Sequence, residues 1–133
     1  MRSLKLPVFV GLLLSACASQ PAPGQDRVEL WQGALVPRDA APPHSWRLKM
    51  RESSDGSFGQ AYELNRTDVT LVGPVLFHAY DGKILATVNL ESGQHRMLLS
   101  RDGKVLAGSW EQIGTDGSTE AAGQAHFELV DVN

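Results

Sequence analysis

Apolar and polar residues alternate along most of the chain after residue 26, and this period of two predicts β-strands. In residues 44–52, HSWRLKMRE, apolar side chains fall on one face and basic side chains on the other. The apolar set is Trp46, Leu48 and Met50, and the basic set is Arg47, Lys49 and Arg51. We interpret the basic set as a solvated strand face. Six further runs alternate in the same way, at 27–36, 57–65, 83–91, 94–101, 104–112 and 124–132.

Residues 68–80, DVTLVGPVLFHAY, are also rich in strand formers but contain Gly73 and Pro74. Proline cannot donate a ladder hydrogen bond, and glycine followed by proline favours a bulge or a bend. The stretch therefore predicts either one bent strand with a bulge or two short strands.

Asp-Gly dipeptides separate several of these runs, at positions 55–56, 81–82, 102–103 and 116–117. Asp-Gly suits tight hairpins, and no gap is long enough for a crossover helix, so the sheet is predicted to be antiparallel. We expect about eight strands in an up-and-down meander that closes into a small barrel, because no helix is present to cover an open sheet. The interior of such a barrel is either filled by side chains or able to hold one small ligand.

The N-terminal residues have a different composition. Arg2 and Lys5 precede an apolar run and the sequence Leu14-Ser15-Ala16-Cys17, which contains the only cysteine of the chain. This is typical of a secretory signal peptide, too short to span a bilayer, and the last four residues resemble a bacterial lipobox. We predict a signal peptide at 1–16, an acylated Cys17 that begins a flexible tether at 17–26, and a barrel domain at 27–133.

The anchor and the charge of the chain narrow its location and its partners. Ala18 follows the cysteine, and in lipoproteins an Asp at this place tends to signal inner-membrane retention. In a two-membrane bacterium, the resemblance therefore implies that the protein lies on the periplasmic face of the outer membrane. The lipid anchor would attach it to that membrane. Without residues 1–16 the chain carries ten Lys plus Arg against fifteen Asp plus Glu, a formal charge of −5. Such an acidic chain, without a basic cluster, is not expected to bind nucleic acid or to bind anionic lipid through its charge.

The last third of the sequence carries a resemblance to bacterial lipocalin-like small barrels, whose closing hairpin has a G-x-W strand and a G-x-F-x-L strand. The matching positions are Leu106, Gly108 and Trp110 on the first strand and Gly123, Phe127 and Leu129 on the second. The stretch SFGQAYEL, at 57–64, is similar to a strand of avidins. The resemblance implies the barrel architecture, and the polar residues that hold biotin have no counterparts in this chain.

Catalytic motifs are not found in the sequence, and we expect neither an enzyme nor a cofactor or metal. Of the four histidines, none has a short His-x-His or His-x-x-x-His spacing, and there is no Gly-x-Ser-x-Gly; the histidines are His44, His78, His95 and His126. Four carboxylates could supply an acid/base pair if they faced one cavity, but the alternation predicts that Glu63 and Glu128 face solvent. The four are Glu63, Asp68, Glu111 and Glu128.

Two functions from different classes remain. In the first, the barrel binds a small hydrophobic or amphipathic ligand, and four aromatic residues line its cavity. These are Trp46, Tyr62, Phe77 and Trp110. In the second, the barrel is filled and acts as an interaction module, an inhibitor or assembly accessory that docks on another envelope protein. Its recognition loops are then predicted at 36–44 and 114–124.

Overall fold

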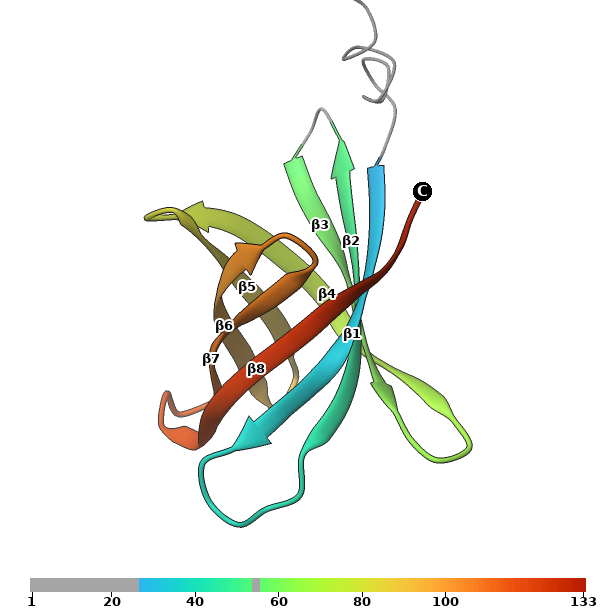
Figure 1. Ribbon diagram of the computed structural model, residues 1–133. Helices are drawn as coiled ribbons and strands as arrows, with labels where there is room; N and C mark the ends of the chain where they lie inside the picture. The colour runs from blue at the N-terminus through green and yellow to red at the C-terminus, as the bar shows by residue number, and fades with distance from the viewer. Residues whose placement is uncertain (1–26, 54–55) are drawn as a thin grey trace, which may run out of the picture.

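The computed structural model describes residues 27–53 and 56–133, and these form eight antiparallel strands in one closed barrel (Figure 1). The strands are β1 (Arg27–Pro37), β2 (His44–Ser53), β3 (Gly56–Leu64), β4 (Val69–Tyr80), β5 (Lys83–Leu90), β6 (Gly93–Asp102), β7 (Val105–Gly114) and β8 (Thr119–Val132). Each strand pairs with the next, so the predicted eight-stranded meander is confirmed. Within the described ranges, no helix is long and apolar enough to cross a membrane. The predicted signal peptide, Cys17 and the tether lie outside these ranges.

The barrel closes through the pairing of β1 with β8. Gly33 lies opposite Phe127 and Leu35 opposite Ala125, and one register shift falls between Leu30 and Trp31. Beyond the strand ladder, Val28 and Asn133 exchange two backbone hydrogen bonds of 3.1 and 2.8 Å. Closure removes the exposed sheet edges that an open meander of this length would have.

The turns follow the sequence signals where the structure describes them. Between β4 and β5, Asp81 has φ 52° and Gly82 has φ 75°. Two consecutive positive φ angles match the twist of a tight antiparallel hairpin, and Asp and Gly tolerate them better than other residues.

Strand β4 resolves the ambiguity at Gly73 and Pro74 in favour of one continuous strand. Its register with β3 shifts between Ala61 and Tyr62, where Ala61 pairs with Gly73 and Tyr62 with Leu71. Pro74 is exposed and points outward. One irregularity thus accommodates the glycine and proline without ending the strand.

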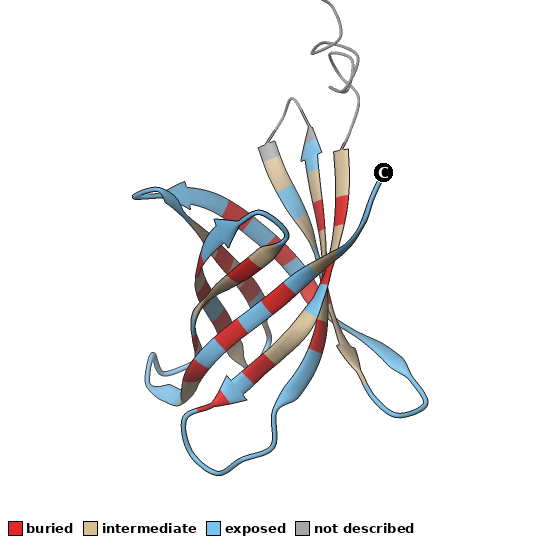
Figure 2. Cartoon of the chain, viewed as in Figure 1, coloured by how far each residue is buried: buried red, intermediate tan, exposed pale blue. Residues whose placement is uncertain are grey.

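The interior of the barrel is packed with apolar side chains. Burial alternates along the strands, as the red and blue bands of Figure 2 show. The largest side chains that are 2% exposed or less come from seven strands and meet in one cluster. They are Trp31, Leu35, Trp46, Leu48, Val75, Val88, Met97, Leu99, Leu106, Trp110 and Phe127. This set supplies the hydrophobic stabilisation of a domain that has no second layer.

The two loops predicted to be long are shorter in the structure. The first covers residues 38–43, because β1 extends through Pro37. The second is only the turn 115–118, because residues 119–124 belong to β8 and pair with β7. The strand was missed there because its residues are small and polar, which weakens the hydrophobic alternation.

Candidate functional site

The two ends of the barrel differ in what they contain. At the near end β1 begins at Arg27, and this end also holds the turns 81–82 and 103–104. The far end holds the connections at 38–43, 65–68, 91–92 and 115–118, and Figure 1 shows the longer of these projecting away from the start of β1. The two connections that sequence analysis singled out therefore lie at the same end. The main-chain N–H of Arg38 donates to the carbonyl of Ala122 across 2.7 Å and joins the first loop to β8.

The near end is closed by a buried carboxylate. Glu29 is 3% exposed and receives two hydrogen bonds from Arg101, from Nη1 to Oε1 and from Nη2 to Oε2, both 3.0 Å long. Arg27 Nη2 adds a third bond of 3.0 Å and the indole of Trp31 a fourth of 3.2 Å. The guanidinium carbon of Arg101 also lies 5.1 Å from the centroid of the Trp31 ring. This bidentate, charge-assisted arrangement satisfies a carboxylate that would be costly to bury alone.

Burial by itself would raise the pKa of Glu29. The hydrogen bonds from Arg101 and Trp31, with the charges of Arg101 and Arg27, outweigh burial and leave the pKa below its usual 4.5. Glu29 is therefore ionised at neutral pH and has all its partners within the chain. We interpret the near end as a structural seal of the barrel.

The far end has a mixed polar and aromatic group, which we name the far-mouth cluster. It comprises His44, Trp46, Glu63, His95 and Trp110. The indole of Trp46 donates to Glu63 Oε1 across 3.3 Å, and His44 Nδ1 lies 4.0 Å from the same oxygen. The indole of Trp110 donates to His95 Nδ1 across 3.1 Å. Strands β2, β3, β6 and β7 supply these residues, so the barrel must close before the cluster can form.

His95 lies against both indoles. Its ring meets that of Trp46 edge to face, with centroids 4.9 Å apart, and it is stacked on Trp110 with centroids 6.1 Å apart. Burial, together with the charge of His44 and against that of Glu63, lowers the pKa of His95 to about 4. Neutral His95 uses Nδ1 as an acceptor, so Nε2 carries the proton.

The far-mouth cluster therefore has a fixed interior side and an accessible rim. The side chains of His44 and Glu63 are 44% and 38% exposed, while Trp46 and Trp110 are 2% exposed or less. In the part of the chain that the structure describes, no three His, Cys, Asp or Glu side chains form a group that could hold a metal ion. The rim offers one imidazole and one carboxylate for contacts with another molecule, above a floor of indole rings.

The four aromatic residues predicted to line a cavity do not share one face. Trp46, Phe77 and Trp110 point into the barrel and are 6% exposed or less. Tyr62 instead points outward, where its hydroxyl donates to Gln60 across 2.6 Å. The structure thus brings Trp46 and Trp110 together at the far mouth, and Tyr62 lies on the opposite face of its strand.

Glu63 was predicted to lie on the solvent face of its strand, but its side chain points to the far mouth, where it is 38% exposed. Glu63 pairs with Trp46 on β2 and Ala61 with Leu48, so the odd-numbered residues of β3 point inward. The alternation of Phe58, Tyr62 and Leu64 suggested the opposite orientation. Glu128 is exposed, as predicted, and Asp68 is exposed as well.

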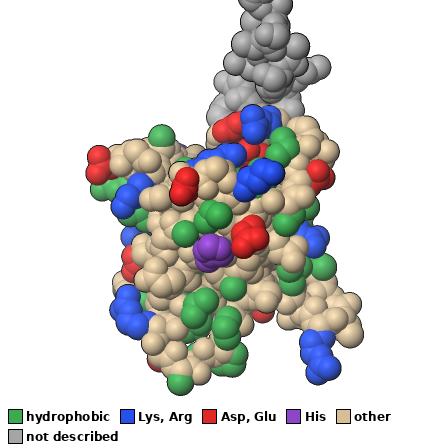
Figure 3. All heavy atoms as spheres, in the orientation of Figure 1, with side chains coloured by type: hydrophobic (Ala, Val, Ile, Leu, Met, Phe, Trp, Pro, Cys, Tyr) green, Lys and Arg blue, Asp and Glu red, His purple; other side chains and the backbone are tan. Residues whose placement is uncertain are grey.

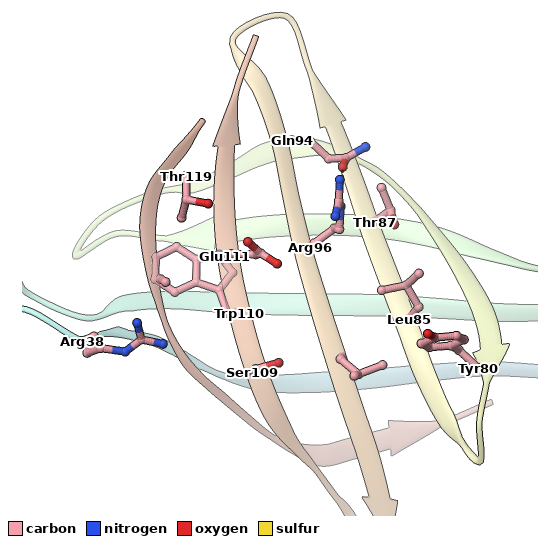
Figure 4. A pocket seen from close by; sticks show the side chains of 12 residues that line it. Arg38, Tyr80, Leu85, Thr87, Gln94, Arg96, Ser109, Trp110, Glu111 and Thr119 are labelled. Carbon is pink, nitrogen blue, oxygen red and sulfur yellow. Dashed lines mark hydrogen bonds between the residues drawn. The ribbon is translucent and has the colours of Figure 1, made fainter. Parts of the chain in front are cut away.

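A separate hollow of about 810 Å³ lies on the outer wall over β5 to β7 (Figure 4). Leu85, Thr87 and Leu98 form part of its floor, and Arg38 and Tyr80 lie at its margins. Arg96 donates from Nε to Gln94 across 2.8 Å within it. The hollow is wide and open, and its polar side chains are not buried. We assign it no chemistry.

Comparison of the chain with protein families, with curated proteins and with solved structures found no match in any of the three.

Proposed function

We propose that this protein is a lipid-anchored, non-enzymatic interaction module of the bacterial envelope, which docks on another envelope protein through the far end of its barrel. The observation that carries the proposal is the packed interior. Trp31, Trp46, Trp110 and Phe127 are all 2% exposed or less within a barrel of eight strands. A barrel of this size is just wide enough for side chains to fill it. Recognition is then left to the ends and the outer wall.

The loop 38–43 supports the far end as the docking point. All six of its residues are exposed, and four of them are apolar: Ala40, Ala41, Pro42 and Pro43. Asp39 Oδ1 accepts a bond of 2.9 Å from the N–H of Ala41, and the two prolines restrict the backbone further. A stiff loop loses little conformational entropy when it binds a partner. The rim residues His44 and Glu63 add polar groups beside it.

The anchor is proposed from the sequence Leu14-Ser15-Ala16-Cys17. Acyl chains on Cys17 would hold the domain on a membrane, at about 0.8 kcal/mol per buried CH₂ group. With Ala18 next to the cysteine, we place the protein on the periplasmic face of the outer membrane. The start of β1 lies at the near end, so an anchor there leaves the far end accessible.

Site-specific photo-cross-linking of the acylated chain in its own membrane tests this proposal. A benzophenone side chain is placed at Ala41 in the loop, and at Ser100 as the control. Both positions are exposed, but Ser100 lies on β6 toward the near end. We expect a discrete cross-linked protein from Ala41 that is lost in the double variant His44→Ala, Glu63→Gln. Equal products from Ser100, or none from Ala41, would reject the far end as the docking surface.

The other function, a small apolar ligand inside the barrel, requires displacement of buried side chains such as Trp46 or Trp110. Purification with a bound ligand would favour it over the interaction module. The packed interior favours the interaction module.

A further inference from the structure

The outer wall of the first five strands has an unusual charge pattern. The even-numbered residues of β1 and β3 and the odd-numbered residues of β2 and β5 point outward. On β4 the outward positions are 69 and 71 before the register shift and the even-numbered residues 74 to 80 after it. Within the described ranges, none of these positions holds Asp or Glu. Four hold cations: Arg47, Lys49, Arg51 and Lys83. We name this surface the β1–β5 wall.

The outward positions of β6, β7 and β8 differ. They include Asp102, Glu111 and Glu128. Figure 3 shows the face on which β8 and β1 lie in front, and there acidic and basic side chains are interspersed. The described outward positions of the β1–β5 wall thus hold basic and no acidic side chains, although the protein as a whole is negatively charged.

The β1–β5 wall also exposes large apolar side chains. Of the eight large hydrophobic residues that are exposed within the described ranges, six lie on β1, β3 and β4, and the other two on β8. The six are Val36, Phe58, Val69, Leu71, Leu76 and Tyr80. Phe58 and Leu76 lie directly opposite each other on β3 and β4, and are 45% and 47% exposed. Contiguous exposed apolar residues mark an interaction surface more often than isolated ones do.

One hollow of about 320 Å³ lies within this wall. Arg47, Lys49 and Tyr62 line it together with the apolar side chains of Val28, Leu30 and Val69. Asp131 and Asn133 of the C-terminal segment complete the lining. Arg47 donates from Nη2 to Gln32 Oε1 across 3.2 Å. Two cations beside an apolar recess suit a group that is anionic at one end and apolar at the other.

We propose that the β1–β5 wall docks on the surface of an anionic phospholipid membrane, the membrane in which the chain is anchored. The basic side chains of the β1–β5 wall contact lipid phosphates, and side chains such as Phe58, Leu76 and Tyr80 enter the headgroup layer. This inference rests on the proposed lipid anchor. The chain enters the barrel at β1, which belongs to the wall. The nine residues 18–26 span at most about 30 Å when fully extended, so the anchor holds the wall close to the bilayer.

Depth-dependent fluorescence on the acylated full-length chain tests the proposal. Because Cys17 is the only cysteine and is acylated, a second cysteine can be labelled with NBD at a single position. The label is placed at Leu76→Cys in the wall, or at Ser109→Cys as a control, which points outward on β7. The protein is reconstituted into vesicles of phosphatidylethanolamine and phosphatidylglycerol, or of phosphatidylcholine alone. Quenching by doxyl-labelled lipid reports contact with the bilayer surface.

We expect quenching at position 76 in the phosphatidylglycerol vesicles, with a blue-shifted emission, and little at position 109. The double variant Arg47→Glu, Lys49→Glu should reduce the quenching at position 76 at least fivefold, since each cation near an anionic surface contributes about a fivefold factor. Arg96→Glu is the matched control, because Arg96 also bonds to a glutamine but lies on β6. It should leave the signal unchanged.

Equal quenching at positions 76 and 109, or none at either, would overturn the proposal. So would protection of position 76 that appears only after an envelope protein extract is added, because the wall would then bind a protein. Mass spectrometry of the same sample shows whether Cys17 carries acyl chains. An acylated chain without quenching rejects the docked wall and retains the anchor, whereas an unacylated chain rejects the anchor itself.

Discussion

The indole nitrogen of Trp110 donates a 3.1 Å hydrogen bond to Nδ1 of His95, and both side chains are buried at the far mouth of the barrel. The two residues lie on adjacent strands but not opposite each other, since Trp110 pairs with Met97 and His95 with Gln112. The bond requires a neutral imidazole, because a protonated His95 has no acceptor nitrogen. The state of His95 therefore links pH to the packing of the far mouth.

We predict that the free energy of unfolding falls as the pH is lowered from about 6.5 to about 4. The pKa of His95 is about 4 in the folded protein, against 6.5 for an ordinary histidine. Between these values the unfolded chain binds a proton that the folded chain does not, so stability rises with pH and is complete above 6.5. The contribution is roughly 3 kcal/mol. Urea denaturation at several pH values measures it.

In the variant His95→Gln, the free energy of unfolding should no longer fall between pH 6.5 and 4, although His44 and Glu63 still face the same position. His126→Gln serves as its control, because the His126 side chain lies on β8 and is 56% exposed. A His95→Gln protein whose stability still falls between pH 6.5 and 4 as in the wild type would assign the effect to another group.

Replacement of Glu29 by Gln should destabilise the protein by about 2 to 3 kcal/mol, because it removes the carboxylate that Arg27 and Arg101 share. Because the pKa of Glu29 is lowered in the folded protein, its contribution to stability is present above pH 4.5. This contribution is lost as the pH falls through the pKa of the folded state. Glu29→Gln should thus also weaken the acid dependence below pH 4.5. Glu128→Gln, whose side chain is 70% exposed, should change stability by less than about 0.5 kcal/mol. Chemical denaturation of both variants at pH 7 and pH 3.5 gives the comparison, and equal losses in the two would contradict it.

Strand β1 approaches β8 so closely that Gly33 has no room for a side chain. A Cβ atom there would lie 1.8 Å from the carbonyl oxygen of His126. We expect Gly33→Ala to cost at least about 2 kcal/mol in thermal or urea unfolding, since the backbone of β8 must move. At Gly73 the nearest atoms would be 3.3 Å away, so Gly73→Ala should cost about 1 kcal/mol or less. The reverse order of the two losses would mean that β1 and β8 are less closely packed.

The removal of Trp46 should turn the filled barrel into one with a cavity. Trp46→Ala is expected to lower the free energy of unfolding by about 3 to 5 kcal/mol, and to let a hydrophobic dye bind that the wild type excludes. Leu76→Ala, on the outer wall, should lose less than about 1 kcal/mol and bind no dye. Dye fluorescence measures the binding by each variant, and urea denaturation measures its loss of stability. Equal dye binding by wild type and Trp46→Ala would show that the barrel already has space.

The fold could be predicted because each strand carries its own signal. Alternation in segments such as 44–52 defines a half-buried strand, and Asp-Gly pairs such as Asp81-Gly82 define the turns. Closure followed from the absence of any helix to cover an open sheet. These are local properties, and they do not depend on which strands lie opposite each other.

The candidate site could not be predicted in the same way. The inward direction of β3 depends on its register with β2, which sets Glu63 beside Trp46. The hydrophobic pattern pointed the other way, because Phe58 and Tyr62 lie on the outer wall. The contact of His95 with Trp46 crosses the barrel from β6 to β2, so it depends on closure and not on sequence spacing. The scattered histidines gave no indication of it.

Native mass spectrometry of the protein, purified gently from the envelope, tests the filled barrel most directly. We predict the mass of the chain with the proposed acyl modification and no further small-molecule adduct, also after incubation with an envelope lipid extract. An adduct of a few hundred daltons that leaves on denaturation would contradict this account, because the barrel interior would then hold a ligand.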